Sequence, residues 1–209
     1  MSQTIATLGR LDLPGRYSFN RRNFYRVIDA GVFEPDDHLE LIEGQIIVKE
    51  RPMKSAHATG LSRSDAKMRQ IFSVEYHVRN QLPITLNNKN EPLPDIAIVV
   101  GSIDDYEAQH PKTAVLIIEI SDTTLRYDRN TKAPLYARAG VPDYWILNLK
   151  ERVLEVRRNP VAMRGKLLGH GYADLQTLTE TESIAPLASP DSLTTVADLL
   201  PRLQEEKIV

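Results

Sequence analysis

The 209-residue chain contains no cysteine, one tryptophan and little net charge. The absence of cysteine excludes disulfide bonds, a thiol nucleophile and thiolate zinc sites. Because 26 Lys and Arg nearly balance 28 Asp and Glu, bulk attraction to nucleic acid is weak, and any such binding must be local. No apolar run approaches the roughly 20 residues of a membrane span, and the N-terminus does not resemble a signal peptide. We therefore expect a cytoplasmic protein with no membrane partner.

The composition is that of a globular protein, with 42% hydrophobic and 26% charged residues. A chain of this length buries roughly 70% of its unfolded surface around one core. We expect an N-terminal arm over residues 1–17 and a single domain over residues 18–209. The motifs described below occupy residues 18–150 of that domain, and further strands and a helix follow over residues 151–209.

Hydrophobic periodicity predicts that helices and strands are mixed along the domain. Helices are expected from Ser18 or Asn20 to Gly31, from a cap at Ser55 onward, from about one turn before Pro134 to Gly140, and from Val196 to Leu203. Strands are expected over residues 39–48, with an interruption at Glu43-Gly44, and over 82–86, 96–100, 115–120, 144–149, 153–156 and 172–178. Several of these strands are apolar throughout, which suits a sheet covered on both faces. The sequence therefore predicts an α/β fold with a central mixed β-sheet flanked by helices.

Two acids stand at the ends of apolar strands. Asp95 opens the strand over residues 96–100, and Glu119 lies near the end of the strand over residues 115–120. If these consecutive strands pair antiparallel, about 4.8 Å apart, both carboxylates meet at one end of the sheet. Carboxylates that close need a proton or a bound cation, and Mg²⁺ takes oxygen ligands of this kind. The alternative is structural, because Pro-Asp is a common turn signal and occurs four times in this chain.

Lys132 is the third candidate of this group. It lies three and four positions before Leu135 and Tyr136, so it shares the helix face that is predicted to pack on the sheet. An ammonium there needs a partner, and the two acids are the candidates. Beside a metal-bound phosphate it would stabilise developing negative charge or position an attacking water. The alternative is a snorkelling side chain in the first helical turn. Asp128 could cap the helix or tether Lys132, and we expect the cap.

These residues belong to a longer pattern. It consists of Glu40-Leu41-Ile42-Glu43-Gly44, His57, Pro94-Asp95, Glu119-Ile120-Ser121, Asp128, Lys132, residues 136–140 and Val141-Pro142-Asp143-Tyr144-Trp145. The pattern covers roughly residues 18–150 and resembles the putative restriction endonuclease family within the PD-(D/E)xK nuclease superfamily. The resemblance implies a restriction-endonuclease-like core, dependence on a divalent metal and hydrolysis of phosphodiester bonds in DNA.

The resemblance also implies site residues. Asp95 and Glu119 take the family's metal-ligand positions, and Glu40 matches the upstream acid, with Glu43 as the substitute if the strand register differs. In the superfamily's plain form the lysine stands two residues after the acid, where this chain has Ser121. Lys132 would therefore replace it from the following helix. The implied set is Asp95, Glu119, Lys132 and Glu40, with Mg²⁺ or Mn²⁺ as the cofactor.

Contacts with the substrate are expected from His57, Ser121, Arg63 and Lys67. The resemblance implies DNA as the partner, and the behaviour of the superfamily implies a homodimer, since two sites related by symmetry cut two strands most easily. Two other classes of protein stay open at this point. One is a nuclease-fold nucleic-acid-binding or assembly module with little or no catalysis. The other is a metal-dependent hydrolase of a small phosphoester, whose site would be an enclosed pocket.

Overall fold

The structure is a computed structural model that describes residues 17–34, 36–49 and 54–202. The predicted N-terminal arm over residues 1–17 lies outside the described residues except for Tyr17. The end of the predicted closing helix, Leu203, also lies outside them. Within the described ranges, no helix is both long enough and apolar enough to cross a membrane.

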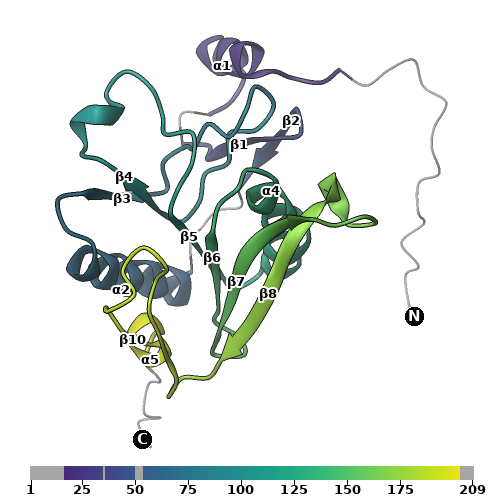
Figure 1. The fold of residues 1–209 in the computed structure, drawn as a ribbon. Helices are drawn as coiled ribbons and strands as arrows, with labels where there is room; N and C mark the ends of the chain where they lie inside the picture. Colours follow the sequence, from purple (N-terminus) through teal and green to yellow (C-terminus); the bar gives the residue numbers. More distant parts are fainter. Residues whose placement is uncertain (1–16, 35, 50–53, 203–209) are drawn as a thin grey trace, which may run out of the picture.

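A six-stranded mixed β-sheet forms the centre of the fold, as predicted (Figure 1). The parallel pair β5 and β6 lies in its middle, and every other neighbouring pair in the sheet is antiparallel. The two middle strands are buried along their whole length, because they are largely apolar on both faces. In spatial order the strands are β3 (Tyr76–Asn80), β4 (Ile96–Val100), β5 (Leu116–Ser121), β6 (Asp143–Asn148), β7 (Val153–Ala162) and β8 (His170–Leu178).

Helices cover both faces of the sheet (Figure 1). On one face, α2 (Ser55–Ile71) and the short α5 (Val196–Leu199) join the buried side chains of the strands in an apolar core. On the other face lies a continuous helical segment made of α3 (Leu125–Tyr127), the π-helical turn η2 (Asp128–Lys132) and α4 (Ala133–Arg138). The predicted α/β class with a helix-flanked mixed sheet is confirmed.

The N-terminal elements attach to the segment that precedes β4. These are α1 (Arg21–Asp29) and a hairpin of β1 (Leu39–Ile42) and β2 (Gln45–Val48). The hairpin turns at Glu43-Gly44, where Gly44 has a positive φ of 74° and a Cβ would lie 3.0 Å from the carbonyl oxygen of Phe19, so glycine is strongly favoured. Main-chain hydrogen bonds between Leu41 and Glu91 hold β1 beside this segment. The smaller elements are η1 (Asp104–Tyr106), η3 (Leu167–Gly169), β9 (Ser183–Ile184) and β10 (Thr194–Thr195).

The prediction of a strand over residues 82–86 is wrong. These residues form no strand of the sheet, and β3 lies beside β4 in its place. Pro83 and Pro92 lack an N–H donor, so the two facing segments make isolated hydrogen bonds, such as the one from Ile84 N to the Pro92 carbonyl at 3.0 Å. A regular ladder of hydrogen bonds cannot form there.

Several predicted boundaries also change. Ser55 is the first residue of α2, and the cap position belongs to Lys54, whose side chain makes no capping hydrogen bond. The helical segment before Gly140 begins at Leu125, earlier than predicted, because the wide turn η2 precedes Pro134 and accommodates its missing N–H. Asp128 therefore lies inside that segment and does not cap it.

The C-terminal elements differ in length from their predictions. β7 and β8 form a hairpin longer than the predicted pieces over residues 153–156 and 172–178. The closing helix α5 ends at Leu199, since Leu200 has extended backbone angles.

Candidate active site

Three buried carboxylates and one buried ammonium meet at one end of the central sheet. Nζ of Lys132 lies 2.8 Å from Oε1 of Glu119 and 3.0 Å from Oε1 of Glu40. The backbone N–H of Asp95 lies 3.4 Å from Oε2 of Glu119. All four residues are at most 3% exposed. We call Glu40, Asp95, Glu119 and Lys132 the carboxylate cluster.

The pairing of β4 and β5 brings two of the acids together. The strands are antiparallel with Ile96 opposite Ile118, so the residue before β4 lies beside the residue after Ile118. The N–H of Ile120 donates to Oδ2 of Asp95 at 2.8 Å and fixes the orientation of that carboxylate. The sequence-based expectation that Asp95 and Glu119 are adjacent agrees with this geometry.

The helical segment contributes Lys132 and Tyr136 from one face. Lys132 ends the turn η2 with a side chain that is 1% exposed, and Tyr136 lies one turn further along. The hydroxyl of Tyr136 donates to Oε1 of Glu119 at 2.9 Å. That oxygen thus receives hydrogen bonds from both side chains, and the helix face predicted from periodicity is the face that meets the acids.

The register of the β1–β2 hairpin separates Glu40 from Glu43. Glu40 lies on β1, is fully buried and accepts a hydrogen bond from the N–H of Leu93 at 2.9 Å. Glu43 lies in the turn with a positive φ of 50°, and its carboxylate pairs with Arg138 and Asn90. Of the two acids that the sequence left open, the structure places Glu40 in the carboxylate cluster.

Burial and charge set the protonation of the cluster in opposite directions for its two strand-end acids. Burial raises the pKa of Glu119 to about 7, against the opposing charges of Lys132 and Lys49. Burial acts the same way on Asp95, but the charge of Lys49 and the hydrogen bond to His57 outweigh it and hold the pKa of Asp95 well below its usual range. The cluster thus combines an acid that ionises readily with one that holds its proton close to neutral pH.

Lys132 keeps its charge in this environment. Burial lowers the pKa of an ammonium, but the charges of Glu119, Glu40 and other nearby acids raise the pKa of Lys132 well above its ordinary value. An ammonium with so high a pKa acts as a hydrogen-bond donor and a fixed positive charge, and it cannot serve as a general base near neutral pH.

His57 contacts the cluster, and Ser121 lies on the strand that carries Glu119. Nε2 of His57, from the first turn of α2, lies 3.5 Å from Oδ2 of Asp95. Burial lowers the pKa of His57, but Asp95 outweighs that effect and the pKa is raised. Ser121 follows Glu119 by two positions on β5, and its buried Oγ has no hydrogen-bond partner.

Gly60 lets α2 approach β5, since a Cβ there would lie 3.1 Å from Cγ2 of Ile120.

Arg63 and Lys67, the other predicted substrate contacts, are not brought to the cluster. They lie on the side of α2 that meets α5. Nε of Arg63 donates to the carbonyl of Asp198 at 3.1 Å, and Nζ of Lys67 lies 2.9 Å from Oδ2 of the same residue. Their contacts hold α5 against α2.

Sequence reasoning missed Lys49 and the polar role of Tyr136. Nζ of Lys49 lies 3.2 Å from Oδ1 of Asp95 and 4.0 Å from Oε1 of Glu40. Lys49 follows the short strand β2, and nothing in its local sequence distinguishes it from a solvated lysine at a strand end. Hydrophobic periodicity identifies Tyr136 only as a residue on the apolar face of its helix, although a buried tyrosine hydroxyl needs a hydrogen-bond partner.

The donor set of the cluster suits a hard divalent cation. Its acids offer carboxylate oxygens, and Oε2 of the fully buried Glu40 has no hydrogen-bond partner, which is a reason to expect a bound water or ion there. Among the described residues, no three acidic or histidine side chains converge as a complete set of metal ligands. One or two carboxylates with several waters are the usual protein ligands of Mg²⁺, so the residues fit such an ion.

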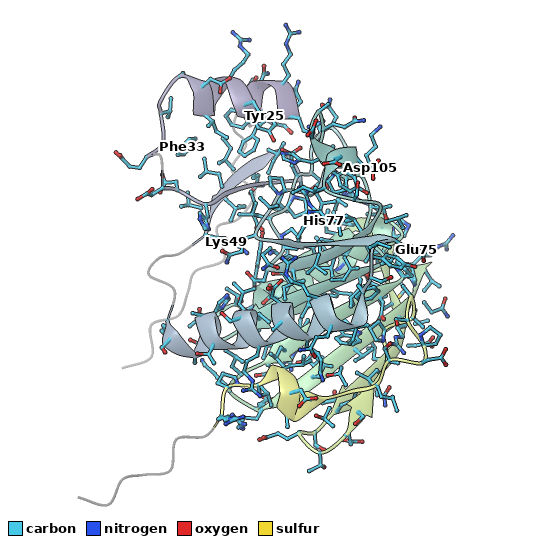
Figure 2. All side chains as sticks on the ribbon, turned by 90° about the vertical axis from the view of Figure 1, so that its left-hand side faces the viewer. Tyr25, Phe33, Lys49, Glu75, His77 and Asp105 are labelled. Carbon is cyan, nitrogen blue, oxygen red and sulfur yellow. The ribbon has the colours of Figure 1, made fainter. Side chains whose placement is uncertain are left out.

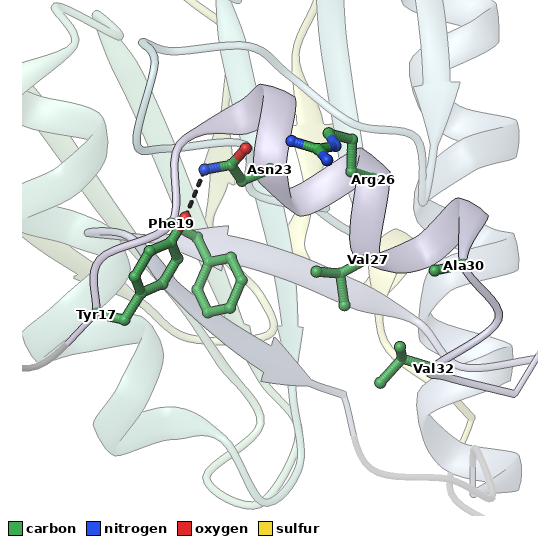
Figure 3. Close-up of a pocket in the computed structure, with 7 residues that line it drawn as sticks. All are labelled: Tyr17, Phe19, Asn23, Arg26, Val27, Ala30 and Val32. Carbon is green, nitrogen blue, oxygen red and sulfur yellow. Dashed lines mark hydrogen bonds between the residues drawn. The ribbon is translucent and has the colours of Figure 1, made fainter.

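Two shallow hollows of the described surface lie away from the cluster. One is beside α1 and is lined by Tyr17, Phe19, Asn23, Arg26, Val27, Ala30 and Val32 (Figure 3). The other follows α2 and is lined by Ser55, Ala58, Thr59, Ser62, Arg63 and Ala66. Neither contains a residue of the carboxylate cluster.

Comparisons with known proteins agree with this fold. No curated protein matches the chain. Among solved structures, a putative nuclease belonging to DUF820 from Anabaena variabilis has a similar fold, with a TM-score of 0.57 and 18% sequence identity, over 77% of this chain and 88% of that one. The model of the family described as putative restriction endonuclease matches residues 22–197, which is most of the chain. The protein therefore belongs to the putative restriction endonuclease family.

Proposed function

We propose that this protein is a divalent-metal-dependent endonuclease of the PD-(D/E)xK type that hydrolyses phosphodiester bonds in DNA. Membership of its family supports nuclease activity. The observation that carries the finer assignment is the carboxylate cluster, because three buried acids converge at one end of the sheet and Oε2 of Glu40 has no hydrogen-bond partner there. A divalent cation that binds such acids stabilises their ionised forms.

Each residue of the cluster has a distinct part in this proposal. Asp95 and Glu119 hold Mg²⁺ or Mn²⁺, with Glu40 completing the site directly or through water. A metal held there would polarise the scissile phosphate and lower the pKa of a bound water. Lys132, which stays protonated, keeps Glu40 and Glu119 in position and places its positive charge where negative charge develops on the phosphate.

His57 and Ser121 are the proposed contacts with the substrate. The imidazole of His57 is about one-fifth exposed and lies beside Asp95, so it is open to a phosphate that approaches the cluster. Ser121 supplies a hydroxyl without a partner in the position where the plain form of the superfamily has its lysine. Arg63 and Lys67 are engaged by α5, so we assign them no primary role in binding DNA.

Cleavage of plasmid DNA tests the assignment. The wild-type protein is incubated with supercoiled plasmid and Mg²⁺ or Mn²⁺, beside Asp95→Ala and Lys132→Ala. We expect both variants to lose at least about 100-fold in rate, since Asp95→Ala removes a proposed metal ligand and Lys132→Ala removes a positive charge that acts on the reacting phosphate. Glu43→Gln is the matched control, because Glu43 is an acid of the same hairpin that lies outside the cluster.

The results separate the proposal from its main rival, a nuclease-fold binding or assembly module. Cleavage that persists in Asp95→Ala would refute the role of the cluster. A wild-type protein that binds DNA but neither binds Mn²⁺ nor cuts would favour the binding module.

We also propose a homodimer, because cleavage of both strands is easiest with two symmetric sites, and light scattering that gives a monomer mass would exclude it.

A further inference from the structure

The two oxygens of Asp95 are held in different ways. Oδ2 receives the N–H of Ile120 at 2.8 Å, which is a donor fixed in the backbone of β5. Oδ1 faces Nζ of Lys49 at 3.2 Å, which is a donor at the end of a flexible side chain. Oδ2 thus sets the orientation of the carboxylate, and Oδ1 is the oxygen whose partner can change.

Lys49 and Lys132 both approach Oε1 of Glu40, but only one of them reaches solvent. Lys132 lies 3.0 Å from that oxygen and its side chain is 1% exposed, whereas Lys49 lies 4.0 Å away and is 23% exposed. Lys49 directly follows β2, and Figure 2 shows it between the β1–β2 hairpin and α2. Its ammonium also donates to the carbonyl of Leu93 at 2.8 Å. Lys49 can therefore turn toward water without opening the core, and Lys132 cannot.

We propose that Lys49 is an exchangeable counter-ion of the carboxylate cluster. Its ammonium holds Oδ1 of Asp95 while no divalent cation is bound, and it gives up that oxygen when Mg²⁺ or Mn²⁺ binds. The inference rests on the proposed function, because it assumes that Asp95 is a metal ligand. It adds a residue that the family pattern described above does not contain.

Electrostatics favours such an exchange. Glu40, Asp95 and Glu119 repel one another in the folded protein, and Lys49 supplies part of the compensating charge. A divalent cation at Oδ1 would place two positive charges within a few ångströms of the ammonium, which repel strongly in a partly buried site. A lysine on a flexible stem can move into water, where an ammonium is well hydrated. Lys49 thus competes with the metal for Asp95.

Removing the competitor tightens metal binding. We expect Lys49→Met, which keeps most of the unbranched side chain and removes its charge, to bind Mn²⁺ at least about tenfold more tightly than the wild type. Lys49→Arg keeps a positive charge and stays within about threefold of the wild type. Lys54→Met is the matched control, since Lys54 is a nearby lysine that is 65% exposed and pairs with Asp122. It measures the general effect of losing one surface charge, which we expect to be less than about threefold.

Calorimetric titration of the metal-free full-length protein with Mn²⁺ provides the measurement, with Asp95→Asn as the variant that loses the metal. If Lys49→Met binds Mn²⁺ no more tightly than the wild type, while Asp95→Asn abolishes binding, the counter-ion role is overturned and the proposed function stands. If the wild type and Lys49→Met both fail to bind Mn²⁺, the metal-dependent function fails and the inference fails with it.

A second measurement needs no variant. Crystals of the wild-type protein are grown without metal and then with Mn²⁺. We expect Nζ of Lys49 within hydrogen-bond distance of Oδ1 of Asp95 in the first structure, and beyond that distance in the second, with Mn²⁺ at the oxygen. A bound Mn²⁺ with the ammonium still on Oδ1 would overturn the exchange.

Discussion

The same dipeptide opens two strands of the sheet and has a different part at each. Pro94-Asp95 precedes β4, and Pro142-Asp143 leads into β6. Both aspartates are buried. Asp95 lies beside two other carboxylates, whereas the carboxylate of Asp143 receives hydrogen bonds from Trp145 Nε1, the guanidinium of Arg158 and the N–H of Leu187.

Strand direction explains the difference. β4 runs antiparallel to β5, so Asp95 at its start lies beside Glu119 near the end of β5. β6 runs parallel to β5, so Asp143 begins its strand at the opposite end of the sheet, where its neighbour on β7 is Arg158. One end of the sheet gathers acids, and the other end pairs an acid with a base.

Hydrogen-bond satisfaction separates a scaffold residue from a site residue here. Both oxygens of Asp143 accept two hydrogen bonds each, and four donors around one carboxylate leave nothing for a ligand. In the carboxylate cluster around Asp95, by contrast, the structure leaves the buried Oε2 of Glu40 without a partner. A buried acid with incomplete partners beside other acids is the better indicator of chemistry than burial alone.

Asp143→Ala gives the largest stability change that this comparison predicts. The substitution strands Arg158, the indole N–H of Trp145 and the N–H of Leu187, and we expect the free energy of unfolding to fall by about 2–4 kcal/mol. Asp95→Ala should cost less, about 1–2 kcal/mol, because Lys49 and His57 are partly exposed and can turn to water, so that only the N–H of Ile120 loses a buried partner. Urea denaturation of both variants in EDTA checks the order.

Equal losses in the two variants would contradict the distinction between a scaffold acid and a site acid. Asp174→Ala is the control for both, since Asp174 lies on the edge strand β8 with an exposed side chain. Its substitution should change the free energy of unfolding by less than about 0.5 kcal/mol.

The sequence predicted the acids better than it predicted their surroundings. Asp95 and Glu119 lie on consecutive strands, so antiparallel pairing alone brings them together. Lys132 could be placed because helical periodicity put it on the face of Leu135 and Tyr136. These are local patterns. The period of two residues in a strand, or of 3.6 residues in a helix, shows which side chains share a face.

The residues that sequence reasoning placed poorly depend on which distant segments meet. Lys49 reaches Asp95 because the β1–β2 hairpin attaches to the segment before β4, and neither strand of the hairpin encodes that contact in its own pattern. Arg63 and Lys67 are expected from the sequence to contact the substrate, but α5, more than 100 residues later, takes their hydrogen bonds. The prediction of a strand over residues 82–86 was wrong because it gave the hydrophobic residues more weight than Pro83 and Pro92, which prevent a regular ladder of hydrogen bonds.

Glu119→Gln is expected to have the second largest effect. It tests the acidic end of the sheet through the pH dependence of the free energy of unfolding. Burial raises the pKa of Glu119 to about 7 in the folded protein, above its ordinary value of 4.5, so the folded state keeps a proton that the unfolded chain releases between these pH values. Linkage then requires the free energy of unfolding to fall as the pH rises through this window, by up to about 3 kcal/mol for one group. Glutamine removes that dependence.

We therefore expect the stability of the wild type relative to Glu119→Gln to decrease by about 1–3 kcal/mol between pH 5 and pH 8, in urea denaturation with EDTA. The Asp143→Ala variant keeps Glu119 and should retain the wild-type slope. Parallel curves for the wild type and Glu119→Gln would show that Glu119 takes up no proton in this pH range in the folded protein, and that burial does not raise its pKa.

Glu43→Gln gives the smallest effect and sharpens the comparison within a single hairpin. Glu43 and Glu40 are three residues apart, yet the side chain of Glu43 is 39% exposed and pairs with Arg138, whereas that of Glu40 is fully buried against Lys132. Because solvent screens the exposed pair, Glu43→Gln should cost less than about 1 kcal/mol and leave plasmid cleavage within about twofold of the wild type. Glu40→Gln removes a carboxylate from the cluster and should reduce cleavage by at least about 100-fold. If Glu43→Gln lost cleavage while Glu40→Gln kept it, the active site would have to lie at the turn of the hairpin. The two acids belong to the same hairpin, and the strand register decides which of them lies beside Lys132.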